Sequence, residues 1–522
     1  MTGEHPADHP ETGVYGRPYV QLPTAAESAA ADRTAHEQFG VPERVLMESA
    51  GRAAALVLSR LYPVGRIVGV AGSGHNGGDL LVMLRTLRAW GRDVLLIAAG
   101  SRPPDNTLSH GDPIDIVSAD AADDALAGAA VIVDGLLGTG FEGAPRGRIA
   151  EWIGRINRAG RPVLSLDVPS GADPTTGAIR TEAVRADVTV TFGWPKLGLM
   201  LHPARTCCGR IVAVEIGFPA DCLDTHSQLI TSGFVRTHYR TRDPAAHKGS
   251  AGRVLVLAGQ EGMAGAAAIA ARAAIRAGAG LVRIASAPEN RVVLQTLVPA
   301  ATFLDRAHVT RDDTEPMHAL VAGPGLGTDE AAQAALTRAL DLMADRPTLL
   351  DADALNILAR EPDRIRAVGG SRELIITPHV RELARITHAR LDEILADAPA
   401  AARAAARELN CIVLLKGQPS VIATPDGELL VNTVGSSDVA TAGMGDQLSG
   451  TIGALLAAGH DALDAAALGL YLSGRAADLA ALGTSLSPDD VSEHLARAIR
   501  DPGPVASPLG LPFITFDQPA RR

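Results

Sequence analysis

The fold is decided by residues 66–79, which read RIVGVAGSGHNGGD. The apolar run Ile67–Ala71 predicts a buried strand, and the glycine-rich loop after it is typical of a strand-to-helix turn that binds anions through backbone N–H groups. A second loop of this kind, AGMGD at residues 442–446, opens an apolar helix-like stretch at Gln447–Ala458. One such loop is often only a tight turn. Two of them, each with an acidic residue, predict two α/β domains that each hold a nucleotide-like anion.

Composition limits the class of protein. The chain has 522 residues, 46% of them hydrophobic, which favours more than one domain. Aromatic residues make up only 3%, so we expect helices that pack through Ala and Gly. The net charge of -11 argues against a nucleic-acid partner. The four cysteines form no CxxC pair, which predicts no zinc site or disulfide framework and favours a reduced, cytoplasmic setting. A polar N-terminus and the lack of long apolar runs predict no membrane span.

Strand-like runs alternate with helix-length segments, which predicts an α/β fold with doubly wound, largely parallel sheets. The predicted strands of the first half are Ile67–Ala71, Val94–Ala98, Val131–Asp134, Val163–Asp167, Val188–Phe192 and Ile211–Ile216. Those of the second half are residues 253–258, Leu281–Ala285, Leu320–Ala322, Thr348–Asp351, Leu374–Thr377 and Ile412–Leu415. We expect a disordered segment at 1–18, domains at 19–225 and 230–500, a connector within 220–246 and a flexible tail at 501–522.

Three loops of the first half follow predicted strands: residues 72–79, 134–141 and 167–171. Ligands of an open α/β sheet bind beyond the carboxyl ends of its strands, so we expect these loops to converge. The oxygen-bearing side chains among them suit an alkali or alkaline-earth cation; they are Asn76, Asp134, Asp167 and Ser170. Each Asp could instead cap a turn or helix, but three such loops together favour a site.

The second half carries a comparable set of loops, and the last of them has the clearest chemistry. Gly443 and Gly445 allow the backbone to approach a phosphate, and the helix dipole adds to the attraction. Asp446 is placed to deprotonate a hydroxyl that attacks a phosphoryl group, a reaction that usually uses Mg²⁺. The alternative is an acidic residue that only stabilises the helix start. His247 and Lys248 fit a solvated turn and a substrate contact equally well.

The first half, over about residues 19–220, closely resembles the YjeF N-terminal domain, the NAD(P)H-hydrate epimerase. The motifs are LMESAG at 46–51, GHNGGD at 74–79, DGLLGTG at 134–140 and DVPSG at 167–171. The resemblance implies that K⁺ is held by Asn76, Asp134 and Ser170, and that Asp167 lies at the substrate. Asp167 is then our candidate acid or base, since epimerisation at a carbinolamine-type carbon needs one. The implied ligand loops are His75, Asn76, Gly77, Gly78 and Asp79, with Gly138, Thr139, Gly140, Phe141, Glu142, Gly143 and Ala144.

The second half, over about residues 230–500, resembles the YjeF C-terminal domain, the ribokinase-like NAD(P)H-hydrate dehydratase. Its motifs are HKG, GPGLG, DADALN, TPH, LLKG and AGMGD. The resemblance implies that the hydrated nucleotide contacts Ala266, Gly325, His379 and Asp446. It implies that ADP or ATP, with Mg²⁺, is held by Lys416, Gly417, Gln418, Pro419, Ser420 and Gly445. The sequence departs from the patterns of the two domains at Ser49, His75, Val380, Arg381, Met444 and Ser473, among others.

Together the two resemblances predict a bifunctional repair enzyme. The N-terminal Rossmann-like domain would interconvert R- and S-NADHX and NADPHX, and the C-terminal ribokinase-like domain would dehydrate the S epimer with ADP or ATP. Only one epimer is a substrate for dehydration, so the first activity feeds the second. We also expect a homo-oligomer. The alternatives are a ribokinase-type small-molecule kinase and an N-terminal half that is a non-catalytic binding module.

Overall fold

Two sheets organise the chain. The computed structural model describes residues 19–520 apart from 101–107, 109–113, 246, 248–250, 505–508 and 512–513. It divides into a first unit, residues 11–229 with 505–522, and a second unit, Ile230–Pro504. The segment predicted to be disordered, residues 1–18, lies outside the described residues.

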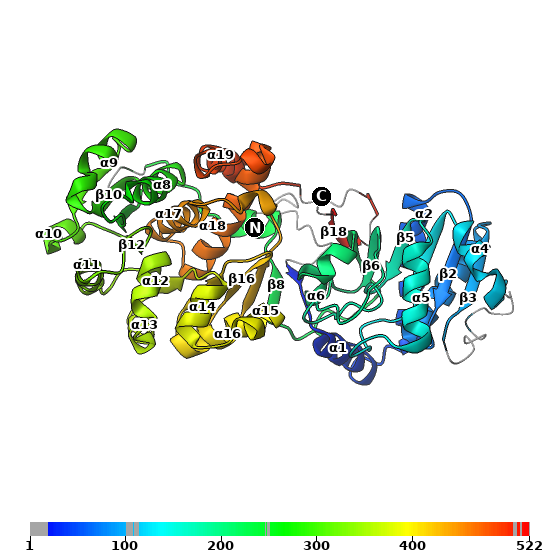
Figure 1. The fold of residues 1–522 in the computed structure, drawn as a ribbon. Coiled ribbons are helices and arrows are strands. Elements are labelled where there is room, and N and C mark those ends of the chain that lie inside the picture. Colours follow the sequence, from blue (N-terminus) through cyan, green and yellow to red (C-terminus); the bar gives the residue numbers. More distant parts are fainter. Residues whose placement is uncertain are drawn as a thin grey trace, which may run out of the picture. The chain divides into compact units, whose positions relative to one another are not determined.

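The sheet of the first unit has the strand order β18-β7-β6-β5-β4-β2-β3 (Figure 1). All neighbours are parallel except β18, which runs antiparallel to β7. The strands are β2 (Ile67–Ala71), β3 (Val94–Ala98), β4 (Val131–Gly135), β5 (Val163–Leu166), β6 (Val188–Phe192), β7 (Arg210–Val214) and β18 (Ile514–Gln518). Strands covered on both faces read as continuous apolar runs, and every residue of β2 is buried.

Helices cover both faces of this sheet. Alternate side chains of β2 point to opposite faces: Ile67 and Ala71 join a core with α1, α2 and α3, whereas Val68 and Val70 join a core with α4 and α5. The helices are α1 (Ala25–Glu37), α2 (Glu43–Leu61), α3 (His75–Ala89), α4 (Ala122–Ala127), α5 (Gly147–Arg158) and α6 (Leu197–Met200). A short antiparallel pair, β1 (Val20–Gln21) with β8 (Ser227–Leu229), completes the description of this unit.

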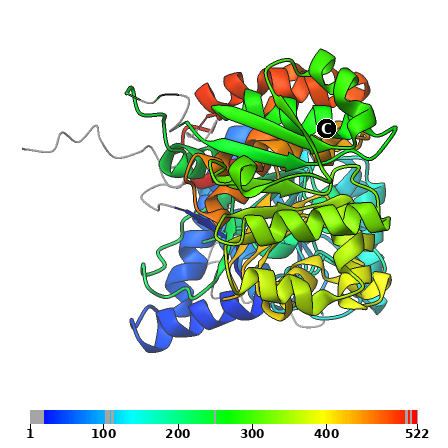
Figure 2. The same ribbon diagram turned by 90° about the vertical axis from the view of Figure 1, so that its left-hand side faces the viewer.

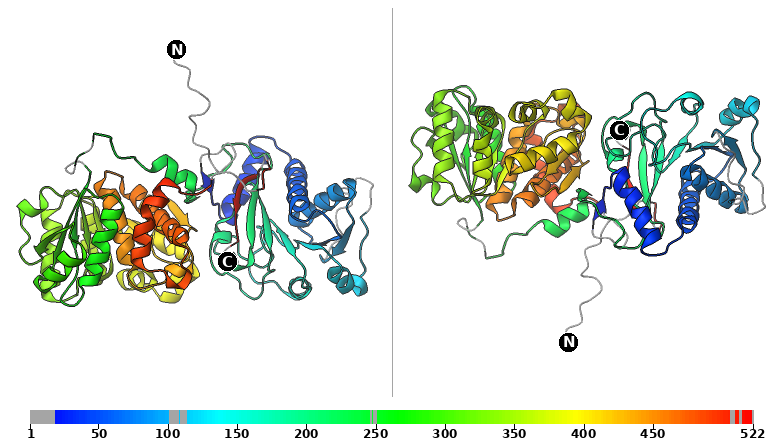
Figure 3. Two further views of the ribbon diagram at one scale, coloured as in Figure 1. Left: turned by 90° about the horizontal axis from the view of Figure 1, so that it is seen from above. Right: turned by 90° about the horizontal axis from the view of Figure 1, so that it is seen from below.

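The C-terminal segment is ordered where it was expected to be a flexible tail. Strand β18, dark red in Figure 3, pairs with β7 from Ile514↔Val214 to Gln518↔Ile211. The Asp517 carboxylate receives both hydrogen bonds of the Arg210 guanidinium, one of them 2.7 Å from Nε to Oδ1, and the Asp517 side chain is 1% exposed. The prediction of a flexible tail over 501–522 is therefore wrong for β18, because a partner strand about 300 residues earlier orders it.

The sheet of the second unit has the order β17-β16-β15-β14-β13-β12-β9-β10-β11. The strands from β15 to β11 are parallel, and β16 and β17 extend the sheet in antiparallel fashion. They are β9 (Arg253–Leu257), β10 (Leu281–Ser286), β11 (Thr302–Asp305), β12 (Ala319–Ala322), β13 (Thr348–Leu350), β14 (Leu374–Ile376), β15 (Ile412–Leu415), β16 (Ser420–Ala423) and β17 (Leu429–Asn432). The predicted parallel, doubly wound α/β class is confirmed for both units.

Helices also lie on both faces of the second sheet (Figure 2). One layer contains α8 (Ala264–Arg276), α17 (Met444–Ala457), α18 (Ala462–Ala480) and α19 (Pro488–Arg500). The other helices of this unit are α7 (Ser232–His238), α9 (Arg291–Leu297), α10 (Arg311–Thr314), α11 (Glu330–Leu342), α12 (Ala352–Leu358), α13 (Pro362–Gly369), α14 (Val380–Thr387), α15 (Leu391–Ala396) and α16 (Ala398–Leu409).

Small residues let α17 lie close to its neighbours, as the composition predicts. A Cβ on Gly450 would stand 2.0 Å from the carbonyl oxygen of Ala270 in α8, and one on Gly453 would stand 2.2 Å from Val321 Cγ2 in β12. Larger side chains at these positions would push α17 off the sheet and displace the loop at its start. Within the described residues, no helix has the length and apolar character needed to cross a membrane.

Candidate functional sites

The first site lies where the strand order reverses, between β2 and β4. The loops after these strands touch, with Gly72 N donating to Gly135 O over 3.0 Å. A Cβ on Gly72 would lie 1.9 Å from Leu136 O, so only glycine fits there. The Asn76 amide joins the third loop by donating to Leu137 O at 2.7 Å and to Leu166 O at 3.0 Å. The three loops therefore converge, as expected for a ligand site at a switch point.

A buried carboxylate fastens two of these loops together. Asp134 is fully buried and accepts hydrogen bonds from Ser170 Oγ at 2.7 Å, Ser170 N at 3.0 Å and Ser165 Oγ at 2.9 Å. Burial raises the pKa of Asp134, while these hydrogen bonds act in the opposite direction. Ser170 Oγ also accepts from Leu137 N at 2.9 Å. Asp134 and Ser170 thus act structurally as well as being candidate cation ligands.

Asn76 supplies the observation that bears on a cation. Its side chain is buried, and its Oδ1 has no hydrogen-bond partner. A buried acceptor left without a donor is costly, and Asp134 and Ser170 carry further oxygen atoms on the two loops that the Asn76 amide joins. This set of oxygen donors fits a hard monovalent cation.

Asp167 forms a buried ion pair that the sequence analysis did not anticipate. Lys196 Nζ donates to Asp167 Oδ1 at 2.6 Å, and also to Thr191 Oγ1 at 3.1 Å and to Phe192 O at 2.9 Å. Asp167 has a left-handed backbone with φ 63°, unusual for a non-glycine residue. One signal for Lys196 was available: it is the single charge in the apolar run 188–201, in which every residue from 191 to 200 is buried.

A cavity of about 990 Å³ opens onto these residues. Some of the predicted ligand residues line this cavity and others do not. His75, Asn76, Asp79 and Asp167 line it, as do residues 138–141. Gly77 and Gly78 do not line it. A Cβ on Gly77 would stand 2.3 Å from Gly72 O, and one on Gly78 would stand 2.7 Å from Met47 Sδ, so these glycines permit close packing. Glu142, Gly143 and Ala144 also lie outside the lining.

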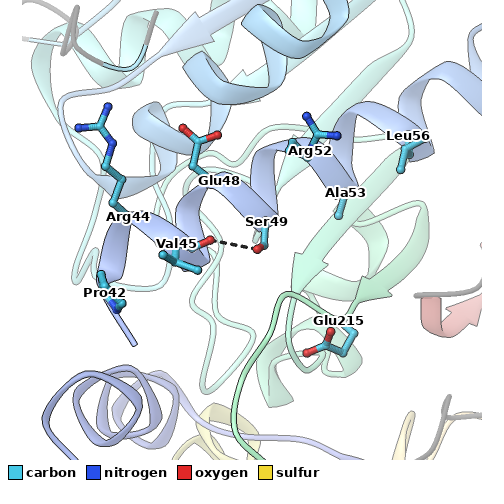
Figure 4. A pocket seen from close by; sticks show the side chains of 9 residues that line it. All are labelled: Pro42, Arg44, Val45, Glu48, Ser49, Arg52, Ala53, Leu56 and Glu215. Carbon is cyan, nitrogen blue, oxygen red and sulfur yellow. Dashed lines mark hydrogen bonds between the residues drawn. The ribbon is translucent and has the colours of Figure 1, made fainter. Parts of the chain in front are cut away.

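A separate hollow of about 730 Å³ lies along α2 (Figure 4). Ser49 of the LMESAG motif lines it and donates to Val45 O at 3.0 Å, so its hydroxyl is bonded within its own helix. None of the predicted site residues lines this hollow.

The second site also lies at a switch point, between β9 and β12. Gly259 N donates to Pro324 O at 2.9 Å, and Gln260 N donates to Gly325 O at 2.6 Å. A Cβ on Gly325 would lie 2.9 Å from Ala266 Cβ, which places these two predicted ligand residues side by side. The glycine-rich GPGLG loop and the start of α8 therefore meet.

A second buried Lys–Asp pair anchors this site. Lys416 Nζ donates to Asp351 Oδ1 at 2.6 Å, and Ser449 Oγ donates to Asp351 Oδ2 at 2.8 Å. Burial opposes ionisation of Asp351, but the Lys416 ammonium outweighs it and holds the pKa of Asp351 below its ordinary value. A Cβ on Gly445 would lie 3.4 Å from Lys416 Nζ and 3.6 Å from Asp351 Oδ2. The absence of a side chain at Gly445 leaves this pair open to a ligand.

Asp446 lies in the first turn of α17, next to that pair. Gly443 caps the helix with φ 88°, a left-handed conformation that favours glycine. Burial, reinforced by the Asp351 carboxylate, raises the pKa of Asp446 to about 7, against the lowering effect of Lys416. Its proton therefore exchanges near neutral pH, as a general base requires.

His379 caps a helix, in addition to any contact that it makes with a ligand. Its Nδ1 accepts from Arg381 N at 3.1 Å and from Glu382 N at 3.2 Å, while Glu382 Oε2 accepts from His379 N at 2.8 Å. This reciprocal capping box starts α14. The other ring nitrogen, Nε2, lies 3.5 Å from Glu382 Oε1, on a side chain that is half exposed.

The predicted nucleotide loop forms a tight turn between β15 and β16. Gly417 N donates to Ser420 Oγ at 3.2 Å, and Ser420 Oγ donates to Gly417 O at 3.0 Å. Gln418 and Pro419 form the tip of this turn, which starts at Lys416. Lys248 of the HKG motif lies outside the described residues, whereas His247 lies within them.

Two switch-point sites, each with a glycine-rich helix start and a buried carboxylate–lysine pair, define a two-unit α/β enzyme that binds nucleotide-like ligands. The family model described as "YjeF-related protein N-terminus" matches residues 43–198, and the model described as "NAD(P)H-hydrate dehydratase" matches residues 254–499. The chain is 35% identical over 495 residues to the bifunctional NAD(P)H-hydrate repair enzyme Nnr of Moorella thermoacetica, covering 88% of this chain and 93% of that relative.

A second relative, the enzyme of the same description from Mycobacterium tuberculosis, is 38% identical over 423 residues, covering 77% of this chain and 80% of the relative. Among solved structures, the ADP/ATP-dependent NAD(P)H-hydrate dehydratase of Bacillus subtilis, co-crystallised with ATP and Mg²⁺, is 32% identical with a TM-score of 0.47, covering 52% of this chain and 97% of that one. The chain belongs to the family of bifunctional NAD(P)H-hydrate repair enzymes.

Proposed function

We propose that the first unit interconverts the R and S epimers of NADHX and NADPHX, and that the second unit dehydrates the S epimer with ADP or ATP. One observation carries the dehydratase half: Asp446, with a pKa of about 7, lies at a glycine-capped helix start beside Gly445 and Lys416. The family shares both halves over most of the chain, which disfavours a lone small-molecule kinase with a non-catalytic N-terminal module.

In the second unit, Asp446 takes the proton of the substrate hydroxyl as that oxygen attacks the terminal phosphoryl group. The glycine-capped start of α17 orients backbone N–H groups toward the phosphates. The C–O bond to the phosphorylated oxygen then breaks with its electron pair on the departing phosphate, the adjacent ring carbon loses a proton, and the C–H electron pair forms the C=C bond that restores the dihydropyridine ring. His379, Ala266 and Gly325 are proposed to contact the hydrated nucleotide, and the turn at 416–420 the adenine nucleotide.

Mg²⁺ is proposed to enter with the phosphates of ADP or ATP and to neutralise their charge when bound. Among the residues that the structure describes, no three His, Cys, Asp or Glu side chains are grouped to hold a metal ion. A cation brought by the nucleotide, with few protein ligands, is a common arrangement for Mg²⁺.

In the first unit, Asp167 is proposed to exchange a proton with the substrate in the cavity that it lines. K⁺ is proposed to be held by Asn76, Asp134 and Ser170, where the unpartnered Asn76 Oδ1 offers an acceptor. When bound, K⁺ would fix the three loops around the substrate. A homo-oligomer and a cytoplasmic setting remain predictions; all four cysteines are free and buried.

The test is incubation of an R/S mixture of NADHX with the protein, K⁺, Mg²⁺ and either ADP or ATP, followed at 340 nm. Full conversion to NADH supports both activities, and conversion of only the S fraction shows that the first unit is inactive. No increase at 340 nm with either nucleotide would refute the proposed dehydratase. Comparison of the two nucleotides identifies the phosphoryl donor.

A further inference from the structure

Five carboxyl groups line the cavity of the first unit, those of Asp32, Glu37, Glu43, Asp79 and Asp167. The surroundings of Asp167 and Asp79 differ most clearly. Asp167 lies 2.6 Å from the Lys196 ammonium through Oδ1, and its Oδ2 accepts a long hydrogen bond of 3.4 Å from Thr139 N. The three acceptors of Lys196 use all of its N–H groups, so Lys196 has no donor left for a substrate. The ion pair fixes Oδ1 of Asp167 against Lys196 and leaves Oδ2, with its one long hydrogen bond, for a ligand in the cavity that Asp167 lines.

Asp79 is the second carboxyl group of this comparison, and no cation among the residues that the structure describes forms an ion pair with it. It lies in the second turn of α3 and lines the same cavity. In the described part of the chain its carboxyl group has no hydrogen-bond partner. The surrounding protein removes water from it and raises the pKa of Asp79 well above the ordinary range. The charges of Asp167, Asp32 and Glu43 act in the same direction, and only Lys196 opposes them.

We propose that Asp79 is the proton donor and Asp167 the proton acceptor of one acid–base pair, with Lys196 as the positioning residue that holds Asp167 ready to accept. Two carboxyl groups in one cavity, one bonded to an ammonium group and the other without a partner among the described residues, have the kind of contrasting environments that divide acid and base roles. This inference rests on the proposed epimerase function and deepens it, since Asp79 has so far been only an expected ligand residue.

The carbon to be inverted carries a hydroxyl group and is bonded to the ring nitrogen. Asp79 gives its proton to the hydroxyl oxygen, the C–O bond breaks with its electron pair on oxygen, and the nitrogen lone pair forms a C=N bond. Water then adds to the opposite face, the π electrons return to nitrogen, and Asp167 takes the proton released. Proton exchange with solvent restores both groups, and the reverse direction uses the same steps backwards.

The test measures epimerisation alone, without ADP or ATP, by following the R/S ratio chromatographically from a pure epimer. The wild-type protein comes first: if it equilibrates the epimers no faster than the spontaneous reaction, the proposed function fails and not the acid–base assignment. If it is active, Asp79→Asn should lower kcat by about 100-fold, as expected for loss of a general acid. The wild-type rate should fall at alkaline pH as Asp79 ionises, and the variant should lack that fall.

Two further variants separate this role from a structural one. Lys196→Met should lower kcat for epimerisation and leave KM nearly unchanged, because Asp167 loses the ammonium group that holds its Oδ1 in place. Asp124→Asn, an exposed carboxylate in the first turn of α4 and outside the cavity, is the matched control and should retain full activity. Tryptophan fluorescence, which reports on the first unit because all three tryptophans lie there, calibrates the amount of folded first unit in each sample. An Asp79→Asn protein that epimerises within threefold of wild type, or keeps the alkaline fall, would overturn the assignment.

Discussion

Replacing Asp446 with asparagine should abolish dehydration and at the same time stabilise the second unit. The carboxylate lies at the start of α17, between the glycines that admit a phosphate and the buried Lys416–Asp351 pair. Asparagine preserves the shape but cannot accept the proton of the attacking hydroxyl. Loss of a general base lowers kcat by about 100-fold or more, and epimerisation, which belongs to the other unit, should be unchanged.

The pH dependence follows from the raised pKa. With a pKa of about 7, about one tenth of Asp446 is ionised at pH 6 and about nine tenths at pH 8. Dehydration by the wild type should therefore rise about tenfold over this range if Asp446 acts as the base. The small residual activity of Asp446→Asn should not follow this curve.

Asp446→Asn should raise the free energy of unfolding even as it abolishes dehydration. A carboxyl whose folded-state pKa lies above its unfolded value stabilises the protein fully at acid pH, and that contribution is lost as the pH rises through the folded-state pKa. Raising the pKa from 3.8 to about 7 corresponds to about 4 kcal/mol. Asp446→Asn removes the cost of ionising this group. It should increase the free energy of unfolding of the second unit by up to about 4 kcal/mol at pH 8, and by almost nothing near pH 4.

Calorimetric melting at pH 4 and pH 8, with dehydration followed at 340 nm, measures both effects on the same samples. Asp438→Asn, a carboxylate in the short turn before the glycine-rich loop, is the matched control. Near-normal dehydration by Asp446→Asn, or a stability gain that is equal at both pH values, would refute the reasoning.

Three further predictions concern the lysine pair, the C-terminal strand and the cations. Lys416→Met should leave Asp351 buried without its cation and lower the free energy of unfolding of the second unit by about 3 kcal/mol; denaturant titration followed by circular dichroism would show it, and an unchanged midpoint would contradict it. Asp517→Asn should weaken the hydrogen bonds from Arg210 and lower the free energy of unfolding of the first unit by about 2 kcal/mol. Tryptophan fluorescence during denaturation measures this, because all three tryptophans lie in that unit. If the unfolding midpoint does not move, the bond from β18 contributes nothing to stability. EDTA should stop dehydration and spare epimerisation, whereas exchange of K⁺ for tetramethylammonium should slow epimerisation; the reverse pattern would exclude the proposed cation at Asn76.

Sequence reasoning worked best for the parallel strands of the first sheet. The predicted bounds of β2, β3 and β6 coincide with those in the structure, because strands buried on both faces read as continuous apolar runs. It failed for β18, whose residues follow a proline-rich segment and become a strand only by pairing with β7. It also took residues 220–246 for a connector, although β8 and α7 lie there. In each case the contacts that stabilise the element come from outside the segment, so its local sequence pattern does not reveal it.

The residues of the two sites also divide into those that the sequence predicts and those that it does not. Motif spacing placed Asp446 at a helix start and brought the loops of the first half to one sheet edge, because strand order determines where loops meet. Spacing could not reveal that Lys196 binds Asp167, or that Lys416 binds Asp351 from 65 residues away. It also could not separate Gly77 and Gly78, which permit packing, from Asp79, which lines the cavity.

The same electrostatic arrangement occurs in both units, although different loops form it. In each, a lysine ammonium lies 2.6 Å from a carboxylate, Lys196 with Asp167 and Lys416 with Asp351. In each, another carboxyl group lies in the early turns of a helix that a glycine caps, and its pKa is raised. The lysine stabilises one negative charge, and that charge disfavours a second one nearby. Burial, reinforced by this repulsion, raises the pKa of the second carboxyl group in each unit. Both proposed reactions move a proton at a hydroxyl-bearing carbon of the same nucleotide, so the same arrangement serves an acid in one unit and a base in the other.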